Sequence, residues 1–155
     1  MEVLIMSRKD IEEYCTVPLL YKTALISITD YQCEFAKLKN PPYYLLQTAF
    51  DDVDNDIFVD ELGRTPTESE RLLIENKWHM LSDEQAKQIS DFYREVKDDV
   101  DIIICQCEHG QSRSAAIAAA ILEYEYKKGI DIFANDDYFP NKVIFRKVLK
   151  SLTDI

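Results

Sequence analysis

The sequence predicts an α/β domain with a central, largely parallel sheet flanked by helices, and three observations predict it. Short apolar runs typical of strands alternate along the chain with segments of helical periodicity. The run at 101–106 does not alternate apolar with polar residues, which is typical of a strand buried on both faces. An alanine-rich helical segment follows it after one short loop. The length of 155 residues suits one core, so we expect a single domain over 1–155.

The N-terminal part of the chain supplies the other strands. Strands are expected at 1–6, 24–29 and 43–50, and short helices at 8–14 and near 33–39. Ser7 is a suitable N-cap for the first of these helices. Pro41-Pro42 is expected to stop the second, because proline cannot continue a helix. Together with the strand at 101–106, these elements interleave strands with helices.

The C-terminal part is expected to be mainly helical. Helices are expected from Thr67-Glu68 toward Trp78, from Ser82 to about Lys97, from Arg113 to Lys127 and from Asn141 to Leu152. Ser82 and Gln85 form a capping box, and the second helix turns Ile89, Phe92, Tyr93 and Val96 toward the core. Gly129 is expected to end the third helix. These helices would cover the sheet.

The loop between the buried strand and the alanine-rich helix carries the chemistry. Such a loop directs backbone N–H groups inward and opens onto a helix N-terminus, where the amide donors and the helix dipole favour an anion such as phosphate. Cys107 begins this loop, and its thiol would be activated as a nucleophile by that positive potential and by Arg113. Arg113 presents a planar fork that binds two phosphate oxygens, and Ser114 carries a hydroxyl within reach of the sulfur. The phosphate-binding positions are Glu108, His109, Gly110, Gln111, Ser112 and Arg113.

The segment 107–114, Cys-Glu-His-Gly-Gln-Ser-Arg-Ser, resembles the phosphate-binding loop of the cysteine-dependent protein tyrosine phosphatases, in the Cys-x-x-Gly-x-Ser-Arg-Ser form of the dual-specificity branch. Pro140-Asn141, followed by Phe145 and Leu149, resembles a second pattern of that branch. The resemblance implies a phosphotyrosine-phosphatase-like fold and hydrolysis through a phosphocysteine, with no metal or cofactor. One position departs from the family, because the usual histidine before the nucleophile is replaced by Gln106, which has no charge.

A general acid is expected just after the third strand. An alkoxide or phenoxide is a poor leaving group unless a positioned acid protonates it. The resemblance implies an aspartate directly after this strand, which here is Asp52, the first choice, or Asp51. A solvated acidic turn is the alternative for most aspartates of 51–56. A calcium loop is disfavoured, because the central glycine and final glutamate of an EF-hand loop are missing.

The charge of the chain limits its partners. A net charge of −11 and a pI near 4.6 repel nucleic acid and anionic membrane surfaces, so neither is expected as a partner. Polyanionic substrates are disfavoured for the same reason, and the loop lacks the basic residues typical of the phosphoinositide phosphatases of this superfamily. Residues 51–70 contain eight acidic residues and one base, Arg64, and form either an acidic rim of the cleft or a solvated insert. A singly phosphorylated protein or small phosphomonoester is the expected substrate.

The cysteines and the N-terminus indicate a cytoplasmic protein. The four cysteines show no metal-ligand spacing and are expected to be free thiols, with Cys15, Cys33 and Cys105 as packing residues. The N-terminal residues do not form a signal peptide, and no apolar run approaches the ~20 residues that span a bilayer. His79 and His109 are expected at the surface or in packing.

These inferences predict a phosphomonoester hydrolase, a protein tyrosine or dual-specificity phosphatase, acting on phosphotyrosine and also on phosphoserine or phosphothreonine. The alternative is a pseudophosphatase that holds phosphorylated partners without efficient hydrolysis, and Gln106 keeps this alternative open. A thiol redox protein that uses Cys105 and Cys107 is a third, remote possibility. The hydrolase and the pseudophosphatase would share the same phosphate loop and would differ only in whether the bound phosphoester is hydrolysed.

Overall fold

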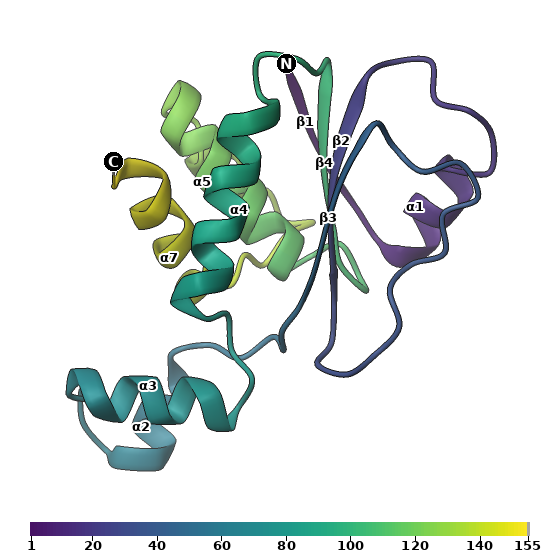
Figure 1. Ribbon diagram of the computed structural model, residues 1–155. Helices are drawn as coiled ribbons and strands as arrows, with labels where there is room; N and C mark the ends of the chain where they lie inside the picture. Colours follow the sequence, from purple (N-terminus) through teal and green to yellow (C-terminus); the bar gives the residue numbers. More distant parts are fainter. Residues whose placement is uncertain (155) are drawn as a thin grey trace.

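A computed structural model describes residues 1–154 and contains one four-stranded sheet with helices on both faces (Figure 1). The strands are β1 (Glu2–Met6), β2 (Thr23–Thr29), β3 (Tyr44–Ala49) and β4 (Ile102–Gln106). Their order is β1-β4-β2-β3, and every pair is parallel. The predicted α/β class with a parallel sheet is confirmed. Because all strands run in one direction, their carboxyl ends meet at one edge of the sheet.

Strand β4 lies in the interior of the sheet, and all five of its residues are buried. Ile103 and Cys105 contribute to the larger hydrophobic core on one face. Ile102 and Ile104 contribute to the smaller core on the other face. This alternation explains why the strand is continuously apolar, since both of its faces are covered.

Three long helices cover the larger core: α4 (Asp83–Val96), α5 (Arg113–Tyr126) and α7 (Lys142–Thr153), with the short α6 (Ile130–Phe133) after α5 (Figure 1). The residues of α5 from 113 to 121 are all buried, and its alanines let the helix lie close to the sheet. In residues 1–154 no helix has both the length and the apolar character needed to cross a membrane.

The predicted end of α5 at Gly129 is wrong. The helix ends earlier, and Lys127 takes the left-handed conformation, with φ 58°. Gly129 instead precedes α6, and a Cβ there would lie 2.8 Å from the Ala119 carbonyl oxygen. The glycine is therefore required by close packing on α5 and not by a left-handed cap.

The opposite face carries α1 (Arg8–Tyr14), which has the predicted bounds and is capped by Ser7. The helix predicted near 33–39 is absent, and residues 33–39 are irregular. Their backbone groups find partners outside the segment, since the Glu34 carbonyl accepts from Arg8 and the Lys37 N–H donates to Glu12. These contacts replace the intrahelical hydrogen bonds that a helix would need.

Two short helices, α2 (Asp56–Leu62) and α3 (Glu68–Lys77), project to one side of the sheet below α4 (Figure 1). The Thr67–Glu70 capping box begins α3, as the sequence predicts for a helix toward Trp78. Helix α2 is not predicted, because its acidic sequence resembles a solvated turn. Phe58, Ile74 and Met80 attach the pair to Val143 at the start of α7.

Candidate active site

The loop from Cys107 to Ser112 joins β4 to α5 at the carboxyl edge of the sheet, where the sequence predicts it. Its shape depends on Gly110, which has φ +67°. A Cβ on this residue would lie 2.7 Å from the Ser7 nitrogen and 2.8 Å from the Met6 carbonyl carbon. The loop therefore passes directly against the β1–α1 junction, and only glycine fits both the angle and the space.

The backbone polarity of the loop is arranged for an anion. Three loop carbonyls accept hydrogen bonds from backbone N–H groups of other segments: Glu108 from Arg8 at 3.1 Å, Gln111 from Phe139 at 2.8 Å and Ser112 from Asn141 at 3.3 Å. The N–H groups of residues 108–112 have no acceptor in the described part of the chain, residues 1–154. Amides left free beside the N-terminus of α5 form a cradle that favours phosphate.

Cys107 lies at the base of this cradle, and only 3% of it is exposed. Its Sγ is 3.1 Å from the Oγ of the buried Ser114. The Ser114 hydroxyl thus lies within reach of the Cys107 sulfur, as the sequence predicts. A hydroxyl at this distance stabilises a thiolate by donating a hydrogen bond to it.

Gln106, at the position where the phosphatases that the loop resembles usually have a histidine, is fully buried. Its Oε1 accepts from the Ser27 hydroxyl at 2.6 Å, and its Nε2 donates to the Cys107 carbonyl at 3.1 Å. The glutamine therefore fixes the backbone of Cys107 through a neutral hydrogen-bond chain from β2. It supplies orientation and no positive charge.

Arg113 is anchored at one end of its guanidinium. Its Nη1 donates to the Phe50 carbonyl at 2.8 Å and lies 2.7 Å from the Asp30 carboxylate. Its Nε and Nη2 have no hydrogen-bond partner among residues 1–154, although the residue is only 5% exposed. These two groups form the edge of the fork that binds two oxygens of one anion.

Asp30 is not among the residues predicted from the sequence. It directly follows β2, the strand that pairs with β4, and this is the signal that would have found it. Acidic residues at the carboxyl ends of neighbouring parallel strands meet at the same edge. Asp30 is a positioning residue in this arrangement, because it contacts the side of Arg113 opposite the free edge.

The structure separates the two candidate acids. The Oδ1 of Asp52 accepts from the Ser112 hydroxyl and from the Asn141 side-chain amide, both at 2.9 Å. The carboxylate of Asp51 instead accepts from the Tyr31 N–H at 2.9 Å. Asp52 thus contacts the phosphate loop itself, and Asp51 does not. The geometry favours the first choice, Asp52, as the residue able to protonate a leaving group.

Two further loop positions, Glu108 and His109, were expected to bind phosphate. The Glu108 side chain pairs with Arg8, its Oε2 lying 2.7 Å from Nε. This pairing compensates a negative charge that would repel phosphate. His109 is exposed, between the half-buried Glu108 and the buried Gly110. These two positions therefore offer their backbone amides to the cradle.

The cysteine predictions are confirmed in part. All four cysteines are free, and Cys15 and Cys105 are buried. Cys33 is exposed, so its predicted packing role is wrong, because the helix expected to bury it does not form. Burial raises the pKa of the Cys105 thiol, which keeps it protonated and unreactive at neutral pH. A redox pair with Cys107 is correspondingly disfavoured.

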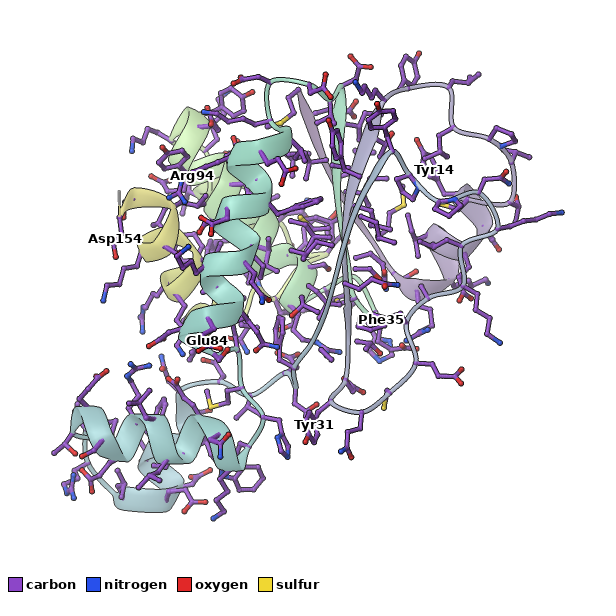
Figure 2. All side chains as sticks on the ribbon, in the orientation of Figure 1. Tyr14, Tyr31, Phe35, Glu84, Arg94 and Asp154 are labelled. Atoms are coloured by element: carbon purple, nitrogen blue, oxygen red, sulfur yellow. The ribbon has the colours of Figure 1, made fainter. Side chains whose placement is uncertain are left out.

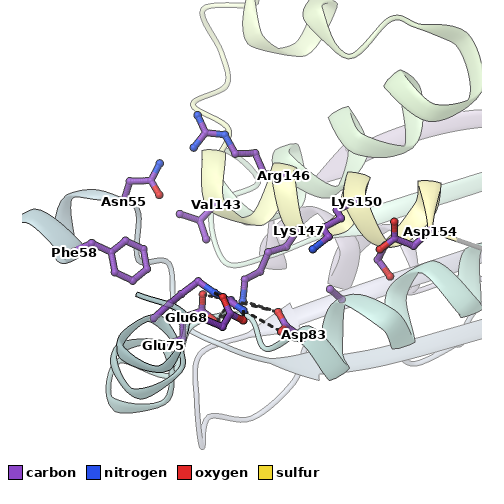
Figure 3. A pocket seen from close by; sticks show the side chains of 13 residues that line it. Asn55, Phe58, Glu68, Glu75, Asp83, Val143, Arg146, Lys147, Lys150 and Asp154 are labelled. Carbon is purple, nitrogen blue, oxygen red and sulfur yellow. Dashed lines mark hydrogen bonds and ion pairs between the residues drawn. The ribbon is translucent and has the colours of Figure 1, made fainter. Parts of the chain in front are cut away.

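A second hollow, of about 490 Å³, lies between α3, α4 and α7 and does not include the loop (Figure 3). Two of its four basic side chains are paired, since Arg71 contacts Glu75 and Asp83, and Lys147 contacts the same two carboxylates. The Arg71 guanidinium holds the pKa of Asp83 below its ordinary value. The ion pairs of Figure 3 link α3 to α4 and α7 and make this hollow a structural junction.

Comparison with known proteins gives a match only at the level of structure. No protein-family model and no curated protein sequence matches the chain. Three solved structures have a similar fold: a mouse protein assigned as a dual specificity phosphatase and complexed with zinc tungstate, human DUSP28, and Tk-PTP in the active form.

The likeness covers nearly the whole chain at low identity. The mouse protein is 14% identical over 96% of this chain and 80% of its own, with a TM-score of 0.53. Human DUSP28 is 14% identical over 97% of this chain and 90% of its own, with a TM-score of 0.52. Tk-PTP is 15% identical over 98% of this chain and 91% of its own, with a TM-score of 0.51. The resemblance to the cysteine-dependent phosphatases is confirmed at the level of the fold.

Proposed function

We propose that the protein is a cysteine-dependent phosphomonoester hydrolase that acts on phosphotyrosine, and also on phosphoserine or phosphothreonine, in cytoplasmic proteins. One observation carries the proposal. The amides of 108–112 have no acceptor among residues 1–154 and belong to the loop that begins at Cys107, and the free edge of Arg113 completes the set of donors. This arrangement matches the three equatorial oxygens of a phosphoryl group under nucleophilic attack.

The first step of the proposed reaction transfers the phosphoryl group to sulfur. The thiolate of Cys107 attacks phosphorus, and the bond from phosphorus to the leaving oxygen breaks with its electron pair remaining on oxygen. Asp52, which the Ser112 and Asn141 side chains hold beside the loop, donates a proton to that oxygen. The products are the free alcohol or phenol and a phosphocysteine.

The second step regenerates the enzyme. Asp52, now ionised, accepts a proton from water as the water attacks phosphorus. The bond between phosphorus and sulfur breaks, inorganic phosphate leaves and the thiolate of Cys107 returns. The Ser114 hydroxyl, 3.1 Å from Sγ, stabilises this departing thiolate. No step in this sequence requires a metal or a cofactor.

The test is turnover of p-nitrophenyl phosphate with EDTA present, comparing the wild type with Cys107→Ser. The proposal expects hydrolysis by the wild type and none by the variant. Ser114→Ala separates the two steps, because it should slow breakdown of the phosphocysteine and leave the initial burst of p-nitrophenol. Binding of vanadate without any wild-type turnover would overturn hydrolysis and favour the phosphate-binding pseudophosphatase.

A further inference from the structure

Strand β1 is an edge of the sheet whose outer side is open. Its inner side pairs with β4, and the Glu2 N–H donates to the Asp101 carbonyl at 2.9 Å. Because backbone groups of alternate residues in a strand point to the same side, those of Val3 and Ile5 point away from β4. Their N–H and C=O groups have no hydrogen-bond partner among residues 1–154. The outer side of β1 therefore offers unpaired donors and acceptors to another strand.

Both faces of β1 are covered, so this lateral edge is the part that a partner can reach. Val3 and Ile5 pack against the larger core, and Leu4 and Met6 pack against the smaller core on the other face. Figure 2 shows Tyr14, which packs against the smaller core, on the opposite side of the sheet from α4. The side chains of β1 are thereby held in place, and the strand keeps its extended shape without a partner.

Strand β1 lacks the features with which proteins usually protect an open edge. Such edges commonly carry a lysine, a proline or a bulge, each of which prevents another strand from pairing. Residues 3–6 are Val-Leu-Ile-Met, they pair with β4 without interruption, and Glu2 is the only charged residue of the strand. At the opposite edge of the sheet, the Gln85 side-chain amide donates to the Ala49 carbonyl of β3 at 2.9 Å. The edge of β1 is therefore the one better suited to pairing.

We propose that β1 is a dimerisation edge, where β1 of a second copy pairs antiparallel and joins the two sheets into one. A two-fold axis at Leu4 places Val3 of each copy opposite Ile5 of the other, and all outward groups then find partners. Any other register places one of these residues opposite a group that lies outside β1 or is already bonded to β4. Glu2 lies opposite Met6 of the second copy, so like charges do not face each other. This dimer is independent of the proposed phosphatase function.

The acidity of the chain limits the strength of this dimer. Two copies that each carry a net charge of −11 repel one another at long range. Salt at about 0.15 M reduces this repulsion, because the Debye length is then about 8 Å. The pairing of one short edge gives a small interface, and small interfaces form weak complexes. We therefore expect a reversible dimer with a micromolar dissociation constant.

Sedimentation equilibrium of the wild type and of Val3→Pro tests the hydrogen bonds of this edge. Proline at position 3 removes an N–H that points outward, so the pairing of β1 with β4 is retained. Each copy loses one donor to the other, and the dissociation constant of the dimer should rise about tenfold or more. A wild type that stays monomeric over roughly 1–200 μM overturns the proposal. An unchanged dissociation constant in Val3→Pro, with the near-UV circular dichroism of the wild type, also overturns it.

Disulfide cross-linking tests the register. The background carries Cys33→Ser and Cys107→Ser, which remove the exposed thiol and the candidate nucleophile and leave only buried cysteines. In the proposed pairing the Cα atoms of the two Leu4 residues are about 4.5 Å apart, a distance that a disulfide spans. The two Val3 residues are displaced by two positions along the strands, so their Cα atoms are about 8 Å apart, which a disulfide does not span. Val3→Cys is therefore the matched control for Leu4→Cys.

We expect Leu4→Cys to form a covalent dimer with oxidised glutathione at least about tenfold faster than Val3→Cys, as measured on non-reducing gels. Both variants, kept reduced, should retain the near-UV circular dichroism of the wild type. Equal rates in the two folded variants, or no covalent dimer in either, overturn the proposed pairing. Neither position lies in the phosphate loop, so these outcomes leave the phosphatase proposal intact.

Discussion

Substitution of Gly110 by alanine tests the structural basis of the phosphate loop, and the chain contains a matched control. Gly63, at the end of α2, has the same φ of +67°, yet a Cβ there would meet nothing within 4 Å. At Gly110 the Cβ would lie 2.7 Å from the Ser7 nitrogen. Both changes impose a left-handed alanine, and only Gly110→Ala adds a collision with backbone.

The expected free energies follow from these two contributions. A left-handed residue with a Cβ costs about 1–2 kcal/mol, which is the whole effect expected for Gly63→Ala. Overpacking against rigid atoms adds about 1–3 kcal/mol, so Gly110→Ala should lower the free energy of unfolding by about 2–5 kcal/mol. The reduced entropy of the unfolded chain is common to both variants and cancels in their difference.

Thermal unfolding followed by circular dichroism measures the difference. For a domain of 155 residues, each kcal/mol shifts Tm by about 2–4 °C, so Gly110→Ala should melt several degrees below Gly63→Ala. Phosphatase activity should fall in Gly110→Ala alone, because the loop must move away from Met6 and Ser7. Equal shifts of Tm in the two variants, or full activity in Gly110→Ala, would refute the role assigned to this close approach.

Three other predictions concern the acid, the arginine and the response to pH. Arg113→Lys should lower kcat about 10²–10³-fold in steady-state assays, because an ammonium cannot present two parallel donors. Asn141→Ala removes a donor to Asp52 and should lower kcat more for an alkyl phosphate than for p-nitrophenyl phosphate, whose leaving group needs less protonation; equal losses would contradict the acid assignment. The pKa of Glu70 is lowered from 4.5 to about 2, and the hydrogen bond from the Arg64 guanidinium is the largest cause. The stability linked to this carboxylate is therefore present above about pH 4.5 and disappears as the pH falls toward 2. The Tm difference between the wild type and Arg64→Gln should accordingly vanish over that range, and a difference that persists at pH 2 would contradict the linkage.

The features predicted from sequence are those determined by neighbouring residues. The start of α1 follows from the Ser7 cap, and α4 begins at the Ser82–Gln85 capping box. The contact between Cys107 and Ser114 follows from a tight loop between a strand and a helix. In each case the determining groups lie within a few residues of one another, so the pattern alone contains the information.

The features that were missed depend on groups far apart in the chain. The segment 33–39 has helical composition, but Arg8 and Glu12 of α1 bind its backbone and prevent the helix. Asp30 and Arg113 are 83 positions apart and meet only because β2 pairs with β4. Local propensity cannot register such contacts, since tertiary partners override it.

The choice between Asp51 and Asp52 shows the same limit at the scale of one residue. Four aspartates occupy 51–56, and neither composition nor spacing distinguishes them. The two side chains have different partners, since Asp51 accepts from the Tyr31 N–H and Asp52 accepts from the Ser112 and Asn141 side chains. The Asn141 side chain, 89 positions away from Asp52, contacts this aspartate and not Asp51.

The charges around the loop indicate how an acidic chain can bind a phosphate. The net charge of −11 repels a dianion at long range, and two cations beside the loop, Arg8 and Arg113, are each paired with a carboxylate. Attraction must therefore come from groups that act at hydrogen-bond distance: the amides of 108–112 and the free edge of Arg113. Such donors act only at short range and in fixed directions, so they accommodate one phosphoryl group. Additional phosphates would meet only the acidic surroundings. Gln106 also contributes no charge, and its hydrogen bonds from the Ser27 hydroxyl and to the Cys107 carbonyl hold the backbone of Cys107 in position.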